Sequence, residues 1–256
     1  MEYASDKVAT ISAAQPDFAD APGRADPKPG DAFYLHVSDL LLALQRHQTH
    51  AAVRVLDFGC GGSPYRALFP NAEYFRADLA TVPNTNFVID DKAKTSAPPG
   101  FFDIVLSTQV LEHCPSPSDY LRECHRVLKQ TGRLLLTTHG LFEDHHCPGD
   151  FFRWTEDGLR LILHECGFQV TSLTRLTMGP RAGLMLLQRS IAAVTLKDRA
   201  WPIRALWWPF RRFLLLRRIF WDPLLNVLFP EYRVSNSQRV PGDNLYIALF
   251  AVAEPR

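Results

Sequence analysis

Residues 55–63 read Val-Leu-Asp-Phe-Gly-Cys-Gly-Gly-Ser, an apolar run that ends in three closely spaced glycines. The apolar part predicts a buried β-strand, and the glycines predict a tight turn after it. Glycine adopts positive φ and lets the backbone approach a ligand closely. In open α/β sheets, nucleotide-like ligands bind at the carboxyl ends of strands. The stretch therefore predicts a ligand-binding turn, although a purely structural turn has the same pattern.

Two phosphate-binding patterns do not fit this turn. The dinucleotide pattern GxGxxG would need a glycine at position 64, which is proline, and the glycine-rich phosphate loop followed by lysine is absent. A nicotinamide-dependent oxidoreductase is therefore disfavoured.

Strand-like and helix-like segments alternate on both sides of the turn. Strands are expected at 53–58, 74–77, 87–89, 102–107, 134–138, 168–173 and 245–252. Helices are expected from about residue 35, after Ser116 with Pro117 in its first turn and a stop at Gly132, and after Thr155. This alternation predicts an α/β fold with a seven-stranded, mostly parallel sheet and helices on both faces.

Acidic residues follow the next two expected strands. Asp78 comes after the strand at 74–77, at the place where a carboxylate accepts the hydroxyls of a ribose in dinucleotide-binding folds. Asp90 and Asp91 follow the strand at 87–89, where a carboxylate could hold an adenine amino group.

Together these landmarks resemble the class I S-adenosylmethionine (SAM) dependent methyltransferases over roughly residues 50–175 and again at the last strand. The sequence DFGCG at 57–61 matches the first motif of the family, and STQVLEH at 107–113 and RVLKQTGRLLL at 126–136 match the next two. The resemblance implies a Rossmann-like sheet with an antiparallel last strand, SAM as cofactor and S-adenosylhomocysteine as product. It does not imply an acceptor, because the family methylates oxygen, nitrogen, carbon and sulfur.

The resemblance also implies which residues contact the cofactor. They are Asp57, Gly59, Gly61, Asp78, Asp90, Asp91 and Gln109. In that scheme Asp57 orders the turn, Asp78 holds the ribose and Gln109 lies near the sulfonium. Either Asp90 or Asp91 would meet the adenine, and the choice stays open.

Residues 139–155 are rich in histidine and aromatic side chains and follow the fifth expected strand. From His145 they resemble an H-x-x-P-x-D-x-x-R-x-T pattern of one bacterial branch of the family. Methyl transfer needs an aligned nucleophile and often a base, for which histidine is suited. We expect His145 to be the base, with His139 and His146 as alternatives. Asp150 and Arg153 are expected to contact the substrate, with an ion pair that pins the loop as an equal alternative.

No metal site is predicted. Histidine and cysteine occur together at 113–114, 124–125 and 145–147, but their spacing matches no zinc pattern. A net charge of +1 disfavours nucleic acid as a partner. Five cysteines without a C-x-x-C pair favour a reduced, cytoplasmic protein without a disulfide framework. Neither a signal peptide nor a membrane-spanning stretch is expected.

The chain is expected to divide into three parts. Residues 1–30 form a flexible N-terminal arm, 31–175 with 245–256 form the SAM-binding domain, and 176–244 form an inserted helical cap, since they are too many for a plain connection.

Residues 201–221 within the cap hold four of the five tryptophans, five arginines and no acidic residue. A helix is expected to start at Pro209 and to end before Pro223. Three interpretations stay open for this segment: a lid over a substrate pocket, an interfacial helix on anionic lipid at the inner membrane face, and a partner or homodimer surface.

The predicted reaction is methyl transfer to a hydroxyl, or less strongly to an amine, of a small molecule or saccharide, with a lipid-linked acceptor compatible with residues 201–221. The saccharide preference comes from the resemblance around residues 145–155. The alternative is a non-catalytic SAM-binding regulatory or scaffold protein.

Overall fold

The computed structural model describes residues 23–235 and 240–256. Seven strands form one sheet in the order β3-β2-β1-β4-β5-β7-β6. Their bounds are β1 Arg54–Phe58, β2 Glu73–Asp78, β3 Phe87–Val88, β4 Phe102–Thr108, β5 Leu128–His139, β6 Phe168–Met178 and β7 Tyr246–Pro255. Strands β1 to β5 pair in parallel, whereas β7 lies antiparallel between β5 and β6. The predicted Rossmann-like sheet with an antiparallel last strand is confirmed.

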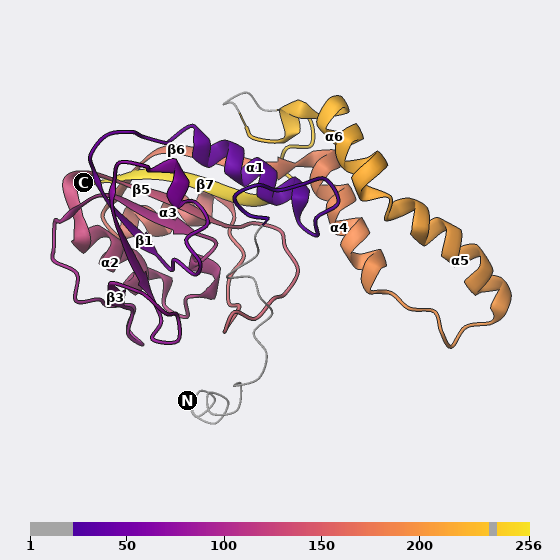
Figure 1. The fold of residues 1–256 in the computed structure, drawn as a ribbon, viewed down its shortest axis with the longest axis horizontal. Coiled ribbons are helices and arrows are strands. Elements are labelled where there is room, and N and C mark those ends of the chain that lie inside the picture. Colours follow the sequence, from indigo (N-terminus) through magenta and orange to yellow (C-terminus); the bar gives the residue numbers. More distant parts are fainter. Residues whose placement is uncertain (1–22, 236–239) are drawn as a thin grey trace.

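Helices cover both faces of the sheet (Figure 1). Their bounds are α1 Tyr34–Gln45, α2 Pro117–Val127, α3 Glu156–Glu165, α4 Gly179–Ala193, α5 Trp201–Leu214 and α6 Asp222–Leu228. Successive residues of β1 alternate between the faces: Leu56 packs in the cluster that holds α2 and α3, and Val55 packs in the cluster that holds α1. Burial of both faces explains the largely apolar sequences of the central strands β1 and β4.

Local signals located the start of α3 but not the boundary between α2 and β5. Thr155 caps α3 as expected, because its hydroxyl accepts a hydrogen bond from the Gly158 N–H at 3.1 Å. The expected helix before Gly132 ends earlier, at Val127, and β5 begins at Leu128. Gly132 therefore lies inside a strand, whose first part pairs irregularly with β4.

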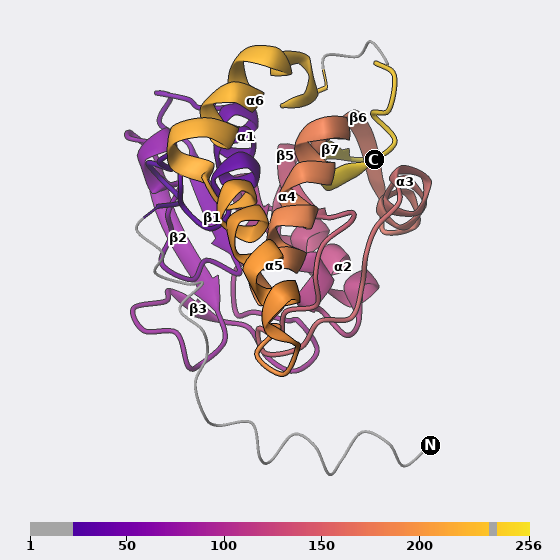
Figure 2. The ribbon, with the colours of Figure 1, turned by 90° about the vertical axis from the view of Figure 1, so that its right-hand side faces the viewer.

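The connection between β6 and β7 forms a helical insertion, α4 to α6, that projects from one end of the sheet (Figures 1 and 2). Strand β6 extends to Met178, so the insertion begins at Gly179 rather than at 176. The predicted helix limits at Pro209 and Pro223 are wrong. Helix α5 contains Pro209 in its interior, and Pro223 lies in the first turn of α6. First-turn prolines cost little, because the missing N–H has no intrahelical acceptor there.

A buried ion pair joins the base of the insertion to the sheet domain. Asp39 of α1 accepts hydrogen bonds from Arg181 of α4 at 2.9 Å and 3.2 Å, and both side chains are fully buried. Arg233 and Thr177 also donate to the Asp39 carboxylate, at 2.7 Å and 2.9 Å. Burial raises the pKa of Asp39 and lowers that of Arg181, so the contact holds two charges that desolvation disfavours.

Helix α5, by contrast, presents large apolar side chains to solvent. Trp201 and Leu206 are each 77% exposed and Trp208 is 64% exposed. The helix is tied to α4 by hydrogen bonds from Gln188 to the Leu214 carbonyl and from Arg211 to the Ala192 carbonyl. Among residues 23–235 and 240–256, no helix has the length and apolar content that crossing a bilayer requires.

Residues 23–33 run in turns beside α1 and α6. The Gly30 N–H donates to the Asp222 carboxylate at 2.8 Å, and Arg217 donates to the Ala32 carbonyl at 2.9 Å. Most of the expected N-terminal arm, residues 1–22, lies outside the described residues.

Candidate functional site

A cavity of about 1080 Å³ opens at the carboxyl ends of β1, β2, β4 and β5. Its lining comes from segments far apart in the sequence, including parts of 23–40, 59–65, 78–93, 108–120 and 139–148. The chain order of the strands reverses between β1 and β4, and this switch point is where α/β folds bind ligands.

The glycine turn after β1 forms one wall of the cavity. Gly59 has φ of +79°, and a Cβ there would lie 2.5 Å from Val110 Cγ2, so neither the backbone nor the space admits a side chain. The Gly61 N–H donates to Asp78 Oδ2 at 2.7 Å, and Asp78 Oδ1 accepts from the Leu79 N–H at 2.7 Å. The structure thus brings the glycine turn into contact with Asp78, the residue expected to bind the ribose.

Asp57 lies behind the turn rather than in the cavity lining. It is 3% exposed and accepts a hydrogen bond from the Tyr74 hydroxyl at 2.8 Å. Burial raises the pKa of Asp57 to about 7, partly offset by hydrogen bonds from Tyr74 and Ser63. Its contact with Ser63 favours the interpretation that it orders the turn.

The other expected cofactor residues line the same cavity. Asp90 and Asp91 are exposed at its rim, and Asp90 Oδ1 accepts from the Lys92 and Lys94 N–H groups, which shapes that loop. Gln109 has φ of +57°, and its N–H donates to the Thr137 carbonyl at 2.9 Å. This contact fixes Gln109 at the junction of β4 and β5.

Two of the three expected bases line the cavity. His139 is 3% exposed, stacks on Phe142, and has Nε2 3.2 Å from Glu112 Oε1. His145 has Nδ1 3.2 Å from the Glu143 carbonyl oxygen. Burial lowers the pKa of both imidazoles, that of His139 well below the usual value, and so favours the neutral form that a general base requires. His146 is exposed and outside the lining.

The sequence did not identify three further polar residues at this site. Glu112 is fully buried, and burial raises its pKa to about 7 despite the 2.8 Å hydrogen bond that it accepts from the Thr138 hydroxyl. His113 and His36 line the cavity, and burial lowers the pKa of His36 to about 4. Glu112 and His113 belong to the family-like motif STQVLEH at 107–113, whereas nothing in the pattern of α1 singles out His36.

Asp150 and Arg153 form the ion pair that the sequence left open as an alternative to substrate contact. The guanidinium binds both carboxylate oxygens at 2.6 Å and 2.7 Å, and it also donates to the Phe142 and Glu143 carbonyls. Although burial acts to raise it, these hydrogen bonds hold the pKa of Asp150 at about 2. Neither residue lines the cavity. This geometry favours the loop-pinning role, and substrate contact stays a prediction.

Comparison with known proteins places these features in a family. Residues 56–136 match a family model described as a methyltransferase domain. The chain carries a class I methyltransferase domain. This domain holds the glycine turn, Asp78 and Gln109, which are the groups expected to meet SAM.

Curated proteins that match this domain include named methyltransferases. A ubiquinone biosynthesis O-methyltransferase of Pseudomonas aeruginosa is 30% identical over 104 residues, 34% of this chain and 45% of that protein. A 2-methyl-6-phytyl-1,4-hydroquinone methyltransferase of Synechocystis is 29% identical over 126 residues, 43% of this chain and 39% of that protein. The matched region spans less than half of each of these relatives.

Solved structures share the fold over more of the chain. The cyclase SpnF matches with TM-score 0.51 and 17% identity, covering 88% of this chain and 84% of the other. A Haloferax volcanii protein in complex with the Trm112 methyltransferase activator matches with TM-score 0.52 and 17% identity, covering 86% and 89%. Since a protein described as a cyclase shares the fold, the fold alone does not name the reaction.

Proposed function

We propose that the protein transfers the methyl group of SAM to a hydroxyl oxygen of a small molecule. One observation supports this most directly: the glycine turn, Asp78, Gln109 and two neutral histidines line a single cavity. The cofactor residues and the residues suited to activate an acceptor are thus within reach of one bound pair of ligands.

The reaction asks little covalent chemistry of the protein. The acceptor oxygen forms a bond to the methyl carbon while the carbon–sulfur bond breaks, and the sulfur keeps the electron pair to give S-adenosylhomocysteine. The hydroxyl proton passes to a base, for which His145 and His139 are placed. Alignment of the reactants and removal of this proton are the contributions the site can make.

Calorimetry with SAM tests the cofactor assignment. Asp78→Ala should weaken binding by about 1–3 kcal/mol, the range for losing hydrogen bonds to a charged group. Asp157→Ala, which removes an exposed carboxylate of α3, is the matched control. Unchanged affinity in a folded Asp78→Ala variant contradicts the assignment, and a thermal shift with NAD but not SAM favours an oxidoreductase.

A screen for S-adenosylhomocysteine release separates an enzyme from a SAM-binding scaffold protein. We expect release with hydroxylated acceptors, among which the matched relatives suggest phenols and the resemblance around residues 145–155 suggests saccharides. SAM binding without release across phenols, saccharides, their lipid-linked forms and amines would indicate the non-catalytic alternative.

We further propose that the insertion contacts an anionic membrane surface without spanning it. The exposed face of α5 combines Trp201, Leu206 and Trp208 with the exposed Arg204 and Arg212. Aromatic and basic residues on one helix are typical of interfacial helices. Such a surface would bring a cytoplasmic enzyme close to acceptors with lipid tails.

Vesicle co-sedimentation tests this contact. Binding is expected to phosphatidylcholine vesicles that contain phosphatidylglycerol and not to pure phosphatidylcholine, with loss at high salt. Arg204→Ala and Arg212→Ala should each weaken the free energy of binding to the anionic vesicles by about 1 kcal/mol. Equal binding to both vesicle types, or to neither, contradicts the proposal. A concentration-dependent dimer that is lost in Trp208→Ser would assign the face to a second copy instead.

A further inference from the structure

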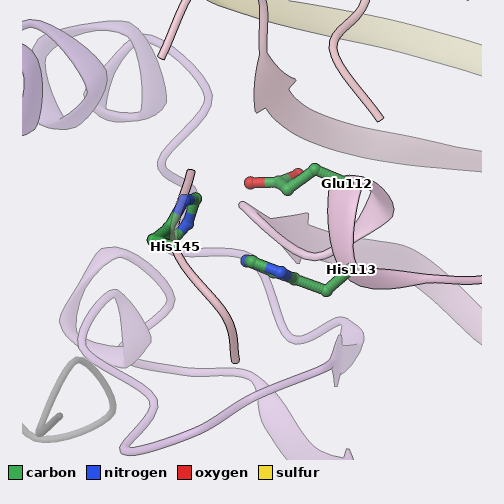
Figure 3. Close-up of side chains that lie close together, drawn as sticks. All are labelled: Glu112, His113 and His145. Atoms are coloured by element: carbon green, nitrogen blue, oxygen red, sulfur yellow. The ribbon is translucent and has the colours of Figure 1, made fainter. Parts of the chain in front are cut away.

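Glu112 and His113 have no role in the proposed methyl transfer, yet they form a cluster with His145, one of its two candidate bases. One nitrogen or oxygen from each side chain lies within 4.8 Å of the other two, and the three point toward one another (Figure 3). Glu112 and His113 are adjacent in the short helix Leu111–His113 after β4, whereas His145 comes from the loop between β5 and α3. Two elements thus place two imidazoles and a carboxylate around one point.

Both imidazoles are oriented by backbone carbonyls. Nδ1 of His113 lies 2.5 Å from the Gly149 carbonyl oxygen, and Nδ1 of His145 lies 3.2 Å from the Glu143 carbonyl oxygen. A hydrogen bond at Nδ1 fixes the ring and assigns coordination to Nε2, which is how metal-binding histidines are commonly held. Coordination through Nε2 would keep both contacts intact.

The carboxylate of Glu112 has an unusual environment. It is fully buried, and within the described part of the chain no hydrogen-bond donor is aligned with Oε1. His139 Nε2 lies 3.2 Å from that oxygen, but the contact lacks the alignment of a hydrogen bond. The nearby Arg153 guanidinium binds both oxygens of Asp150. A buried carboxylate in such a place is expected to be protonated or to meet a cation.

We propose that Glu112, His113 and His145 bind one divalent transition-metal ion, with an open coordination position toward the cavity. Two histidines and one carboxylate are a ligand set of catalytic zinc sites, which keep a fourth position for water or substrate. Because zinc–nitrogen bonds are about 2.0–2.1 Å, ligands on one ion lie about 3.4 Å apart. The ligand atoms, which lie within 4.8 Å of one another, therefore have to approach by at most about 1.4 Å when the ion binds.

The ion would change how the acceptor is activated, an extension that rests on the proposed function. His113 and His145 line the cavity that Gln109 also lines, so an acceptor on the ion and SAM would occupy the same cavity. A hydroxyl oxygen coordinated there would pass its proton more readily to His139, the other candidate base in the cavity, since a divalent cation would stabilise the resulting anion. His145 would then act as a ligand rather than as the base.

Metal binding can be measured without SAM or acceptor. The protein is stripped with a chelator, dialysed against Zn²⁺ and analysed for bound metal. We expect one ion per chain in the wild type, and loss of that ion in Glu112→Gln and in His145→Ala. His146→Ala removes the neighbouring exposed imidazole and should keep the ion.

Cobalt substitution checks the ligand set. Cys114 and Cys147 also line the cavity and could bind zinc through sulfur. Co²⁺ in the proposed site should show visible ligand-field bands without the intense near-ultraviolet bands of a cobalt–thiolate bond, and Cys147→Ser should leave the spectrum unchanged. Thiolate bands, absence of bound metal, or equal metal content in wild type and both ligand variants would overturn the proposal. Since SAM binding is measured separately, each of these results leaves the methyltransferase assignment intact.

Discussion

The glycine turn after β1 and helix α5 differ in how many of their residues make contacts within the protein. In the turn, steric contact and hydrogen bonding leave little choice: Gly59 abuts Val110, and the Gly61 N–H binds Asp78. In α5, tryptophan and leucine side chains are exposed rather than packed against the sheet. A motif whose residues constrain the backbone can be interpreted locally, whereas the exposed apolar side chains of α5 support only a proposal about what the helix contacts.

The largest effect is expected at the ion pair between Arg181 and Asp39, which joins the insertion to the sheet domain. Arg181→Met leaves Asp39 buried without its bidentate partner and should lower the free energy of unfolding by about 3–5 kcal/mol. Chemical denaturation measures this loss. Lys28→Met removes an exposed ion pair with Asp26 and should cost less than about 1 kcal/mol. Equal stability of the two variants would show that the insertion is not anchored through Arg181.

The rate of methyl transfer should depend on His145. His145→Ala is expected to lower turnover by about a hundredfold or more at unchanged SAM affinity, because it removes either the base or a metal ligand. Activity with an acceptor from the release screen, alongside calorimetry, measures both quantities. His164→Ala, an exposed histidine of α3, is the matched control. Normal turnover in His145→Ala would transfer the role to His139.

The buried carboxylate behind the glycine turn predicts a pH effect. The pKa of Asp57 is about 7 in the folded chain against 3.8 for an ordinary aspartate. The stability contributed by its bound proton is complete below pH 3.8 and is lost as pH rises to 7. Between pH 5 and pH 8, Asp57→Asn should therefore gain about 2–3 kcal/mol relative to the wild type. Chemical denaturation at both pH values measures this difference. If the difference in unfolding free energy between Asp57→Asn and the wild type is the same at pH 5 and pH 8, Asp57 is not buried in its protonated form.

The smallest effect is expected on the exposed face of α5. Trp208→Ser should change the free energy of unfolding by no more than about 0.5 kcal/mol, because the side chain is 64% exposed. The same substitution should reduce vesicle binding, so stability and membrane affinity separate. A loss of several kcal/mol would mean that α5 is packed in solution, and the contrast with the glycine turn would disappear.

Much of the fold could be predicted from the sequence because local patterns determine it. Strands β1, β4, β5 and β7 each contain an apolar run, and Thr155 marks the start of α3. The limits of β5 and α5 could not be predicted, because Gly132 and Pro209 are tolerated inside elements that tertiary packing extends. A glycine or proline shows that the chain can turn at that residue, but tertiary packing determines where a helix or strand ends.

The candidate site divides in the same way. Asp78 and Gln109 follow strands of the central motifs, so the resemblance identified them from their positions. The approach of Glu112 and His113 to His145 could not be predicted, because 31 residues or more separate them and no metal-binding spacing spans such a gap. The folded loop brings them together, held in part by the contacts of Arg153 with the Phe142 and Glu143 carbonyls.

The contacts of residues 23–33 give the cavity wall a mechanical link to the insertion. This segment lines the cavity, and its backbone is held from behind by Asp222 and Arg217. Arg189 of α4 adds a further attachment, with its guanidinium 4.1 Å from the centre of the Phe33 ring. We therefore expect a displacement of α4 or α6 to displace this wall of the cavity as well.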